Sequence, residues 1–163
     1  MPLDRLFRLD DAAWRRHASP WSVWTRVATF PVVVLAGWSA HWIGWWALLP
    51  GALLLVWTYL NPRMFAEPAT FESWASQVTL GERLWLQPGR PAVDPAHVTP
   101  VRCLTVLSAV GLPVVLAGVV ARAPGWTLFG TALVMLGKLW FCDRMVWLYR
   151  DARRETPELA SFD

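Results

Sequence analysis

Two long stretches of this chain carry no charged side chain. Residues 27–60 and residues 103–121 contain no Asp, Glu, Lys or Arg. A helix that crosses the hydrocarbon core of a bilayer needs about 20 predominantly apolar residues. A water-soluble domain rarely continues that far without a charge. The pattern therefore predicts an integral membrane protein.

The apolar stretches divide into four predicted transmembrane helices, over residues 20–40, 42–60, 100–120 and 125–141. Short turns join the first helix to the second and the third to the fourth, so each pair is a helical hairpin. The predicted fold class is all-α, with one membrane domain over residues 1–163. Glycines seven residues apart predict that the last two helices approach each other closely; they are Gly111, Gly118, Gly130 and Gly137.

The basic residues are distributed unevenly between the two ends of these helices. The first turn has no Lys or Arg, and the second has only Arg122. Cytoplasmic loops carry the excess of Lys and Arg in membrane proteins. We therefore expect a multi-pass protein of the cell inner (plasma) membrane, with both termini and the central loop in the cytoplasm. The arginines of these cytoplasmic segments are Arg5, Arg8, Arg15, Arg16, Arg63, Arg83, Arg90, Arg144, Arg150, Arg153 and Arg154.

The central loop, residues 62–98, is interrupted by prolines but contains one helical pattern. Four of its residues fall roughly on one face of a helix: Phe71, Trp74, Val78 and Trp85. One interpretation is a short helix lying on the membrane surface. The other is that this segment packs against the ends of the membrane helices. Both interpretations also apply to the first fourteen residues, and residues 147–163 are predicted to be a cytoplasmic tail.

The second hairpin looks like a copy of the first. Residues 17–65 align with residues 97–146 at an offset of 80 to 82, with "HASP" on "HVTP", "PVVVLAG" on "PVVLAG" and "NPRM" on "CDRM". Two copies with the same orientation are related by an axis along the membrane normal. The alignment predicts a tandem duplication with a pseudo-twofold axis. In each copy a Ser or Thr precedes a Pro, which suits a helix N-cap followed by its first position.

Composition narrows the classes of function. The chain has 163 residues, of which 55% are hydrophobic and thirteen are Trp, and its net charge is +3. The basic residues flank the apolar segments, so they give no sign of nucleic-acid binding. The two cysteines, Cys103 and Cys142, are not in a CxxC pair, and no HxxH or ExxH spacing occurs. We expect no metal and no cofactor.

Four candidate binding residues occupy matching positions in the two copies: His17 and His97, and Arg63 and Arg144. Around a twofold axis they would meet in a cationic mouth on the cytoplasmic side, suited to a phosphate or carboxylate such as an anionic lipid headgroup. The alternative is that each arginine anchors a helix end and each histidine is a solvated loop residue. Arg26 and Lys138, which lie inside apolar segments, join the binding set, with snorkelling to the interface as the alternative.

Asp143 is the one candidate for catalysis. A buried carboxyl group among tryptophans would suit acid chemistry on an isoprenoid, as in small membrane terpene cyclases. If Asp143 instead pairs with Arg26 or Arg63 at a packed helix end, a binding or structural role is favoured. A third class, the assembly subunit of a membrane complex, has a similar sequence pattern. Membrane lipids, a second copy of the chain or another membrane protein are the expected partners.

The stretches "SPWSVWTR", "NPR" and "GERLW" resemble an uncharacterised family of small bacterial and archaeal membrane proteins. The resemblance covers mainly residues 17–86. It implies a membrane location, and it brings no activity and no catalytic residues with it. The favoured function is the binding of a lipid-like or anionic amphiphile, or of a membrane partner, without chemistry. The runner-up is a small membrane enzyme acting on a lipid or isoprenoid.

Overall fold

The computed structural model describes residues 11–87 and 93–155, and these residues form helices joined by turns and by an irregular segment over residues 65–73. No strand occurs among them, so the described part of the chain is all-α, as predicted. In chain order the elements are α2 (Asp11–His17), α3 (Pro20–Ile43), η1 (Gly44–Ala47), α4 (Leu48–Met64), α5 (Trp74–Leu86), η2 (Pro95–His97), α6 (Val98–Val120) and α7 (Pro124–Glu155). Of the N-terminal segment predicted to pack or lie on the membrane, residues 1–10 lie outside the described residues.

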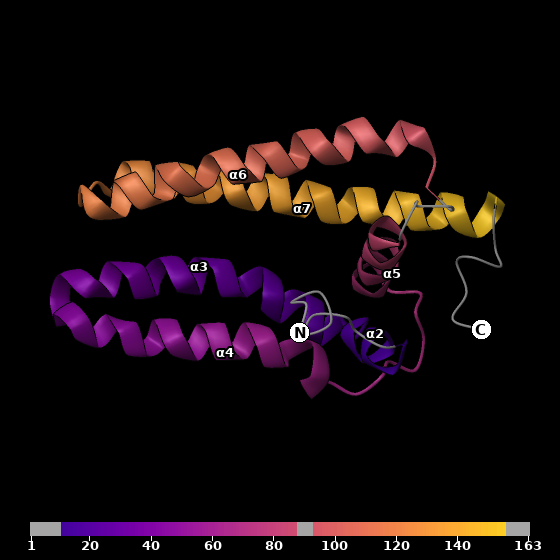
Figure 1. Cartoon of the computed structure of the whole chain (residues 1–163), viewed down its shortest axis with the longest axis horizontal. Coiled ribbons are helices and arrows are strands. Elements are labelled where there is room, and N and C mark those ends of the chain that lie inside the picture. The colour runs from indigo at the N-terminus through magenta and orange to yellow at the C-terminus, as the bar shows by residue number, and fades with distance from the viewer. Residues whose placement is uncertain (1–10, 88–92, 156–163) are drawn as a thin grey trace, which may run out of the picture.

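The helices α3 and α4 run antiparallel, and the 3-10 turn η1 joins them (Figure 1). Gly44 begins this turn with a φ of 55° and a ψ of −131°, a conformation that side-chain-bearing residues rarely adopt. Ser19 occupies the N-cap position of α3 and Pro20 its first position, as the sequence predicted. The corresponding expectation for the second copy is wrong: α6 begins at Val98 with His97 as its N-cap, so Thr99 and Pro100 lie inside its first turn.

The hairpin of α6 and α7 is tightly packed through four of its glycines. A Cβ on Gly111, Gly118, Gly130 or Gly137 would lie 3.0 Å or less from backbone atoms of the facing helix. The close approach predicted from glycine spacing is therefore confirmed. On the first hairpin, by contrast, a Cβ on Gly51 would meet nothing within 4 Å. The two hairpins therefore use their small residues differently.

The last helix extends well beyond its predicted end at residue 141. α7 has 32 residues, which corresponds to about 48 Å at 1.5 Å per residue. Residues 147–155, expected in a tail, are thus helical. The extension is stabilised because α5 packs on it, and one core cluster includes Val78 and Leu84 of α5 and Met145 and Leu148 of α7. The rest of the tail, residues 156–163, lies outside the described residues.

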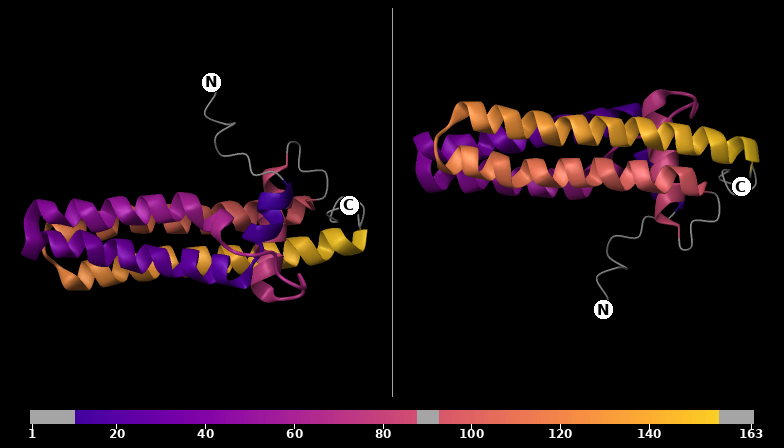
Figure 2. Two further views of the ribbon diagram at one scale, coloured as in Figure 1. Left: turned by 90° about the horizontal axis from the view of Figure 1, so that it is seen from below. Right: turned by 90° about the horizontal axis from the view of Figure 1, so that it is seen from above.

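The helix α5 lies across the ends of the long helices (Figure 1), and Figure 2 shows the two hairpins lying alongside each other from two further directions. Residues 75–81 are buried, so this segment packs against helix ends. Phe71, Trp74 and Trp85 pack against the core cluster. At the opposite end, Nε2 of His41 in α3 donates a hydrogen bond of 2.8 Å to the Val119 carbonyl of α6. This hydrogen bond also joins the two hairpins.

Three helical stretches of the described chain are long and apolar enough to cross a membrane. They are Pro20–Asn61, Pro95–Val120 and Pro124–Glu155. The first of them contains the reversal at η1, and the most apolar part of it buries none of its residues inside the molecule. Surfaces this apolar suit a hydrocarbon surrounding. By length and composition, these stretches indicate a membrane protein.

Candidate functional site

Where α5 meets the two hairpins, one carboxylate lies between two cations. Arg26 of α3 approaches Oε2 of Glu82 at 3.4 Å, and Lys138 of α7 lies 3.6 Å from Oε1 of the same residue. The side chains of Arg26 and Glu82 are 22% and 13% exposed, whereas Lys138 is 42% exposed. The bridge therefore joins both hairpins to α5, and Lys138 is its most accessible cation.

Arg26 has further contacts at this place. One of its terminal nitrogens donates to Thr79 Oγ1 at 3.4 Å, and Thr79 in turn donates to the His17 carbonyl at 3.4 Å. The Nε of Arg26 is buried without a hydrogen-bond partner. A buried guanidinium nitrogen normally finds an acceptor. Arg26 therefore has unused hydrogen-bonding capacity directly beside Glu82.

Behind the bridge, four side chains form a buried hydrogen-bonded chain. Asn61 donates through Nδ2 to Thr25 at 2.8 Å, and its oxygen accepts from Ser22 at 2.9 Å. Ser22 has only one hydroxyl proton and gives it to Asn61. The 3.2 Å contact between Ser22 and His17 must then be a donation from Nδ1 of His17. The chain fixes which ring nitrogen of His17 carries the proton.

This environment keeps His17 neutral. Its pKa falls from 6.5 to about 3, first because burial disfavours the charged ring and then because Arg26, Lys138 and Arg63 repel it. The three cations therefore act on the same region. Ser22 beside the histidine is fully buried, so the pair offers no substrate access and is not a nucleophile with its base.

Four of the six predicted binding residues lie in one region, and the other two lie at separate places. Arg26 and Lys138 meet at Glu82. The His17 carbonyl accepts from Thr79 on the same helix as Glu82, and Arg63 is near enough to lower the pKa of the His17 ring. The guanidinium of Arg63 also lies over the Tyr59 ring at 4.8 Å. We call Arg26, Arg63, Glu82 and Lys138 the cationic corner.

The other two predicted residues lie elsewhere. Nε2 of His97 is 3.1 Å from a carboxylate oxygen of Asp151, and its Nδ1 is buried without a partner. Arg144 lies over the ring of Trp147, at 5.1 Å from its centre. The structure thus does not gather both histidines and both arginines into one mouth, because the second copy pairs them with neighbours on α7 that the first copy lacks.

Asp143 pairs with neither Arg26 nor Arg63. It is half-buried and accepts a hydrogen bond of 3.2 Å from Nε1 of Trp74, whose ring stacks on Trp24. Beside it lies a groove of about 320 Å³ between the ends of α6 and α7. We call this the aromatic groove; it is lined by Pro100, Cys103, Leu104, Trp140, Asp143, Arg144 and Trp147.

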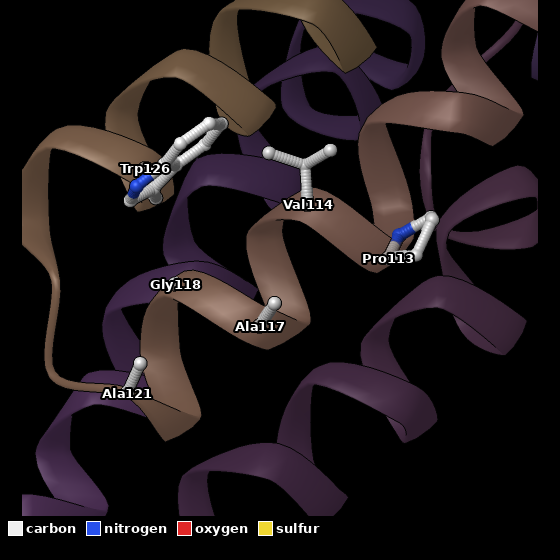
Figure 3. Close-up of a pocket in the computed structure, with 6 residues that line it drawn as sticks. All are labelled: Pro113, Val114, Ala117, Gly118, Ala121 and Trp126. Carbon is white, nitrogen blue, oxygen red and sulfur yellow. The ribbon is translucent and has the colours of Figure 1, made fainter.

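Two other grooves are apolar. One of about 480 Å³ lies near the α6–α7 turn, where small side chains of α6 face Trp126 (Figure 3). The other, of about 610 Å³, follows the first hairpin and is lined by residues of α3 and α4 from Val33 to Thr58. None of their lining residues is ionisable. These grooves suit hydrocarbon and offer no reactive group.

The acid at the centre of the corner, Glu82, is absent from the residues selected by sequence. Its signal was present, because Glu82 follows Val78 by four residues and precedes Trp85 by three. It therefore falls on the face predicted to be apolar, where a carboxylate needs a partner. Asn61 and Ser22 carried no such signal. Within residues 11–87 and 93–155, no group of three His, Cys, Asp or Glu side chains is placed to hold a metal ion.

A family model described as a family of unknown function (DUF6653) matches residues 2–161. The chain belongs to this family. The match confirms the resemblance to an uncharacterised family and extends it from residues 17–86 to nearly the whole chain. No curated protein and no solved structure matches the chain.

Proposed function

We propose that this protein spans the inner membrane of the cell four times, as two hairpins, and binds an anionic amphiphile at the cationic corner. The single observation that carries the proposal is that Arg26 and Lys138, from different hairpins, share one carboxylate. Two cations thus share one anion, and Arg63, which is near enough to repel a charge on His17, adds positive charge to the same region. His17, being neutral, adds none.

The distribution of charge supports an orientation with the α5 end in the cytoplasm. The end of α2 and the start of α6 lie at the same end of the molecule as α5 (Figure 1). Arg15 is in the last turn of α2, Arg63 is in the last turn of α4, and Arg150 donates to Gln77 of α5. The two turns at the other end contribute Arg122 alone. This asymmetry is the one expected for a cytoplasmic α5 end.

Two features support the duplication of the hairpin. Equivalent residues of the two copies are buried alike: His17 and His97 are each 5% exposed, and Asn61 and Cys142 are 0% and 1% exposed. Each hairpin also begins and ends at the α5 end (Figure 1). The copies differ in the polar partners of their equivalent residues, so the proposed binding site is the cationic corner alone and has no counterpart in the second copy.

An amphiphile is favoured over a free anion because the corner adjoins apolar surface. The groove along α3 and α4 includes Val33, which is one helical repeat of seven residues from Arg26. That separation is about 10 Å along a helix. A headgroup at Lys138 and Arg26 would leave its hydrocarbon chain beside this groove. Phosphate and carboxylate headgroups both accept the hydrogen bonds that guanidinium and ammonium donate.

Binding is favoured over acid catalysis by the surroundings of Asp143. A groove does border this residue, which is the feature expected of an enzyme. However, Trp140 and Trp147 on its rim are 57% and 53% exposed. Cyclisation of an isoprenoid requires an enclosure that excludes water from a reactive cation. An open groove of this kind suits recognition of a group rather than protection of an intermediate.

Native mass spectrometry of the protein released from its own membrane tests the proposal. The informative variant is Lys138→Gln. The matched control is Arg102→Gln, which also removes one positive charge, from an exposed position near the start of α6. Wild type and the control should retain an added mass of an anionic amphiphile, and Lys138→Gln should lose it. Equal retention by all three proteins would reject the cationic corner as the binding site.

A further inference from the structure

The aromatic groove carries a positive and a negative side chain on one face of one helix. Trp140, Asp143, Arg144 and Trp147 follow one another at spacings of three, one and three residues. Residues three, four and seven apart lie on the same side of an α-helix. Asp143 is about 140° around α7 from Lys138 at 100° per residue. The groove and the cationic corner are therefore separate places.

Asp143 retains acceptor capacity in this groove. Its Oδ1 takes the Trp74 hydrogen bond. Among the described residues Asp143 forms no ion pair, although the neighbouring Arg144 is cationic. A carboxylate has about four lone-pair positions, of which one hydrogen bond uses one. A cation in the groove would supply the missing partner.

The tryptophans favour a particular kind of cation. Trp140 and Trp147 are both more than half exposed, and the Arg144 guanidinium already covers the face of Trp147. Aromatic faces attract organic ammonium groups, and tryptophan does so most strongly. Stacking on Trp147 holds the Arg144 guanidinium by its face. The N–H donors in its plane can then bind an anionic oxygen. The groove thus offers one site for an ammonium and one for a phosphate.

An apolar surface continues from the groove toward the middle of the helices. Val106 and Val110 on α6 and Leu136 on α7 are exposed. The two valines follow Cys103 by three and seven residues, and Leu136 precedes Trp140 by four. A soluble phosphate ester would gain nothing from that surface. Hydrocarbon chains attached to the headgroup would cover it. These exposed apolar residues favour a lipid as the occupant.

We propose that the aromatic groove binds the headgroup of a zwitterionic phospholipid of the phosphoethanolamine type. Its ammonium lies between Asp143 and the Trp140 face, and its phosphate lies on Arg144. This site is independent of the anionic amphiphile at the cationic corner. Its ligand differs in net charge, so the two sites are told apart by the lipid that each retains.

Lipid retention by the whole purified protein tests this site. Delipidated protein is titrated with phosphatidylethanolamine or phosphatidylglycerol and examined by native mass spectrometry, in wild type, Asp143→Asn and Arg144→Gln. Asparagine still accepts from Trp74, so the fold is retained. We expect Asp143→Asn to lower phosphatidylethanolamine retention about fivefold, the effect of a partly exposed charge pair, and to leave phosphatidylglycerol retention unchanged. Arg144→Gln should lower phosphatidylethanolamine retention as well.

Two controls make the result decisive. Lys138→Gln should weaken phosphatidylglycerol retention only, which separates failure of this site from failure of the cationic corner. Soluble phosphoethanolamine at the same concentration should not displace the lipid. Unchanged phosphatidylethanolamine retention in Asp143→Asn overturns the proposal, and displacement by soluble phosphoethanolamine overturns its assignment to a lipid.

Trp147→Phe, which keeps an aromatic face, should retain the lipid better than Trp147→Ala. Equal loss of the lipid in both variants also contradicts the site.

Discussion

Gly81 of α5 lies against the main chain of Met145 in α7, with no room between them for a side chain. A Cβ on Gly81 would overlap the carbonyl oxygen of Met145 and would also be too close to two of its other backbone atoms. This contact sets the depth at which α5 crosses α7. It therefore also sets the position of the next residue, Glu82, between Arg26 and Lys138.

Substitution of Gly81 by Ala should destabilise the protein. The overlapping atoms are backbone atoms of a long helix, so relief requires movement of α5, and overpacking of this kind costs about 1–3 kcal/mol. Thermal unfolding in detergent micelles measures the loss. Gly51→Ala is the matched control, because a Cβ there meets nothing within 4 Å and alanine favours a helix. A Gly81→Ala protein as stable as the control would contradict the close contact.

Glu82→Gln should lower stability and raise anionic-lipid retention at the same time. Removing the carboxylate leaves Arg26 and Lys138 facing each other without an anion, with an expected loss of about 1–2 kcal/mol. The same change increases the positive charge offered to a headgroup. Unfolding midpoints and native mass spectra of one preparation give both quantities. Lower stability with lower retention of the anionic lipid would show that the corner does not bind it.

Acid should destabilise the protein partly through His17. Its pKa is about 3 in the folded protein and 6.5 when exposed, so the unfolded state binds the proton more readily. The stabilisation is fully present above pH 6.5 and is lost as pH falls toward 3, at up to about 1.4 kcal/mol per pH unit. His17→Asn keeps a donor for Ser22 but cannot titrate. Unfolding free energies of wild type and variant should therefore diverge between pH 6.5 and 4, and parallel curves would contradict this assignment.

The orientation of the hairpins can be tested with two introduced cysteines. In a Cys103→Ser background, the remaining Cys142 is buried. Arg154→Cys lies at the α5 end, and Arg122→Cys lies in the turn at the other end. A membrane-impermeant maleimide should label Arg154→Cys only in inside-out vesicles and Arg122→Cys only in right-side-out vesicles. The reverse pattern would place the α5 end outside the cytoplasm.

The apolar pattern of the sequence predicted the helices well, because hydrocarbon imposes a simple length rule. It failed at the end of α7, where residues 147–155 remain helical. That extension depends on contacts of Met145, Leu148 and Ala152 with the α5 segment. Such contacts join residues about seventy positions apart in the chain, and no local pattern contains them.

The candidate site was predicted in part. Arg26, Lys138 and His17 were selected and do come together. The repeat predicted that His97 and Arg144 would join their counterparts His17 and Arg63, but a pseudo-repeat constrains backbone positions more than side-chain pairing. His97 instead meets Asp151, which lies beyond the end of the aligned repeat. Glu82 was missed because it belongs to the connecting segment, which the comparison of the two copies left out.

The most direct measurement of the central claim is the thermal stability of delipidated protein during titration with phosphatidylglycerol. A ligand that binds only the folded state stabilises it by RT ln(1 + [L]/Kd), so Tm rises as the free lipid concentration exceeds Kd. We expect a rise in Tm for wild type and for Arg102→Gln, and a much smaller rise for Lys138→Gln. The same rise in all three proteins, or none in wild type, would contradict binding of an anionic amphiphile at the cationic corner.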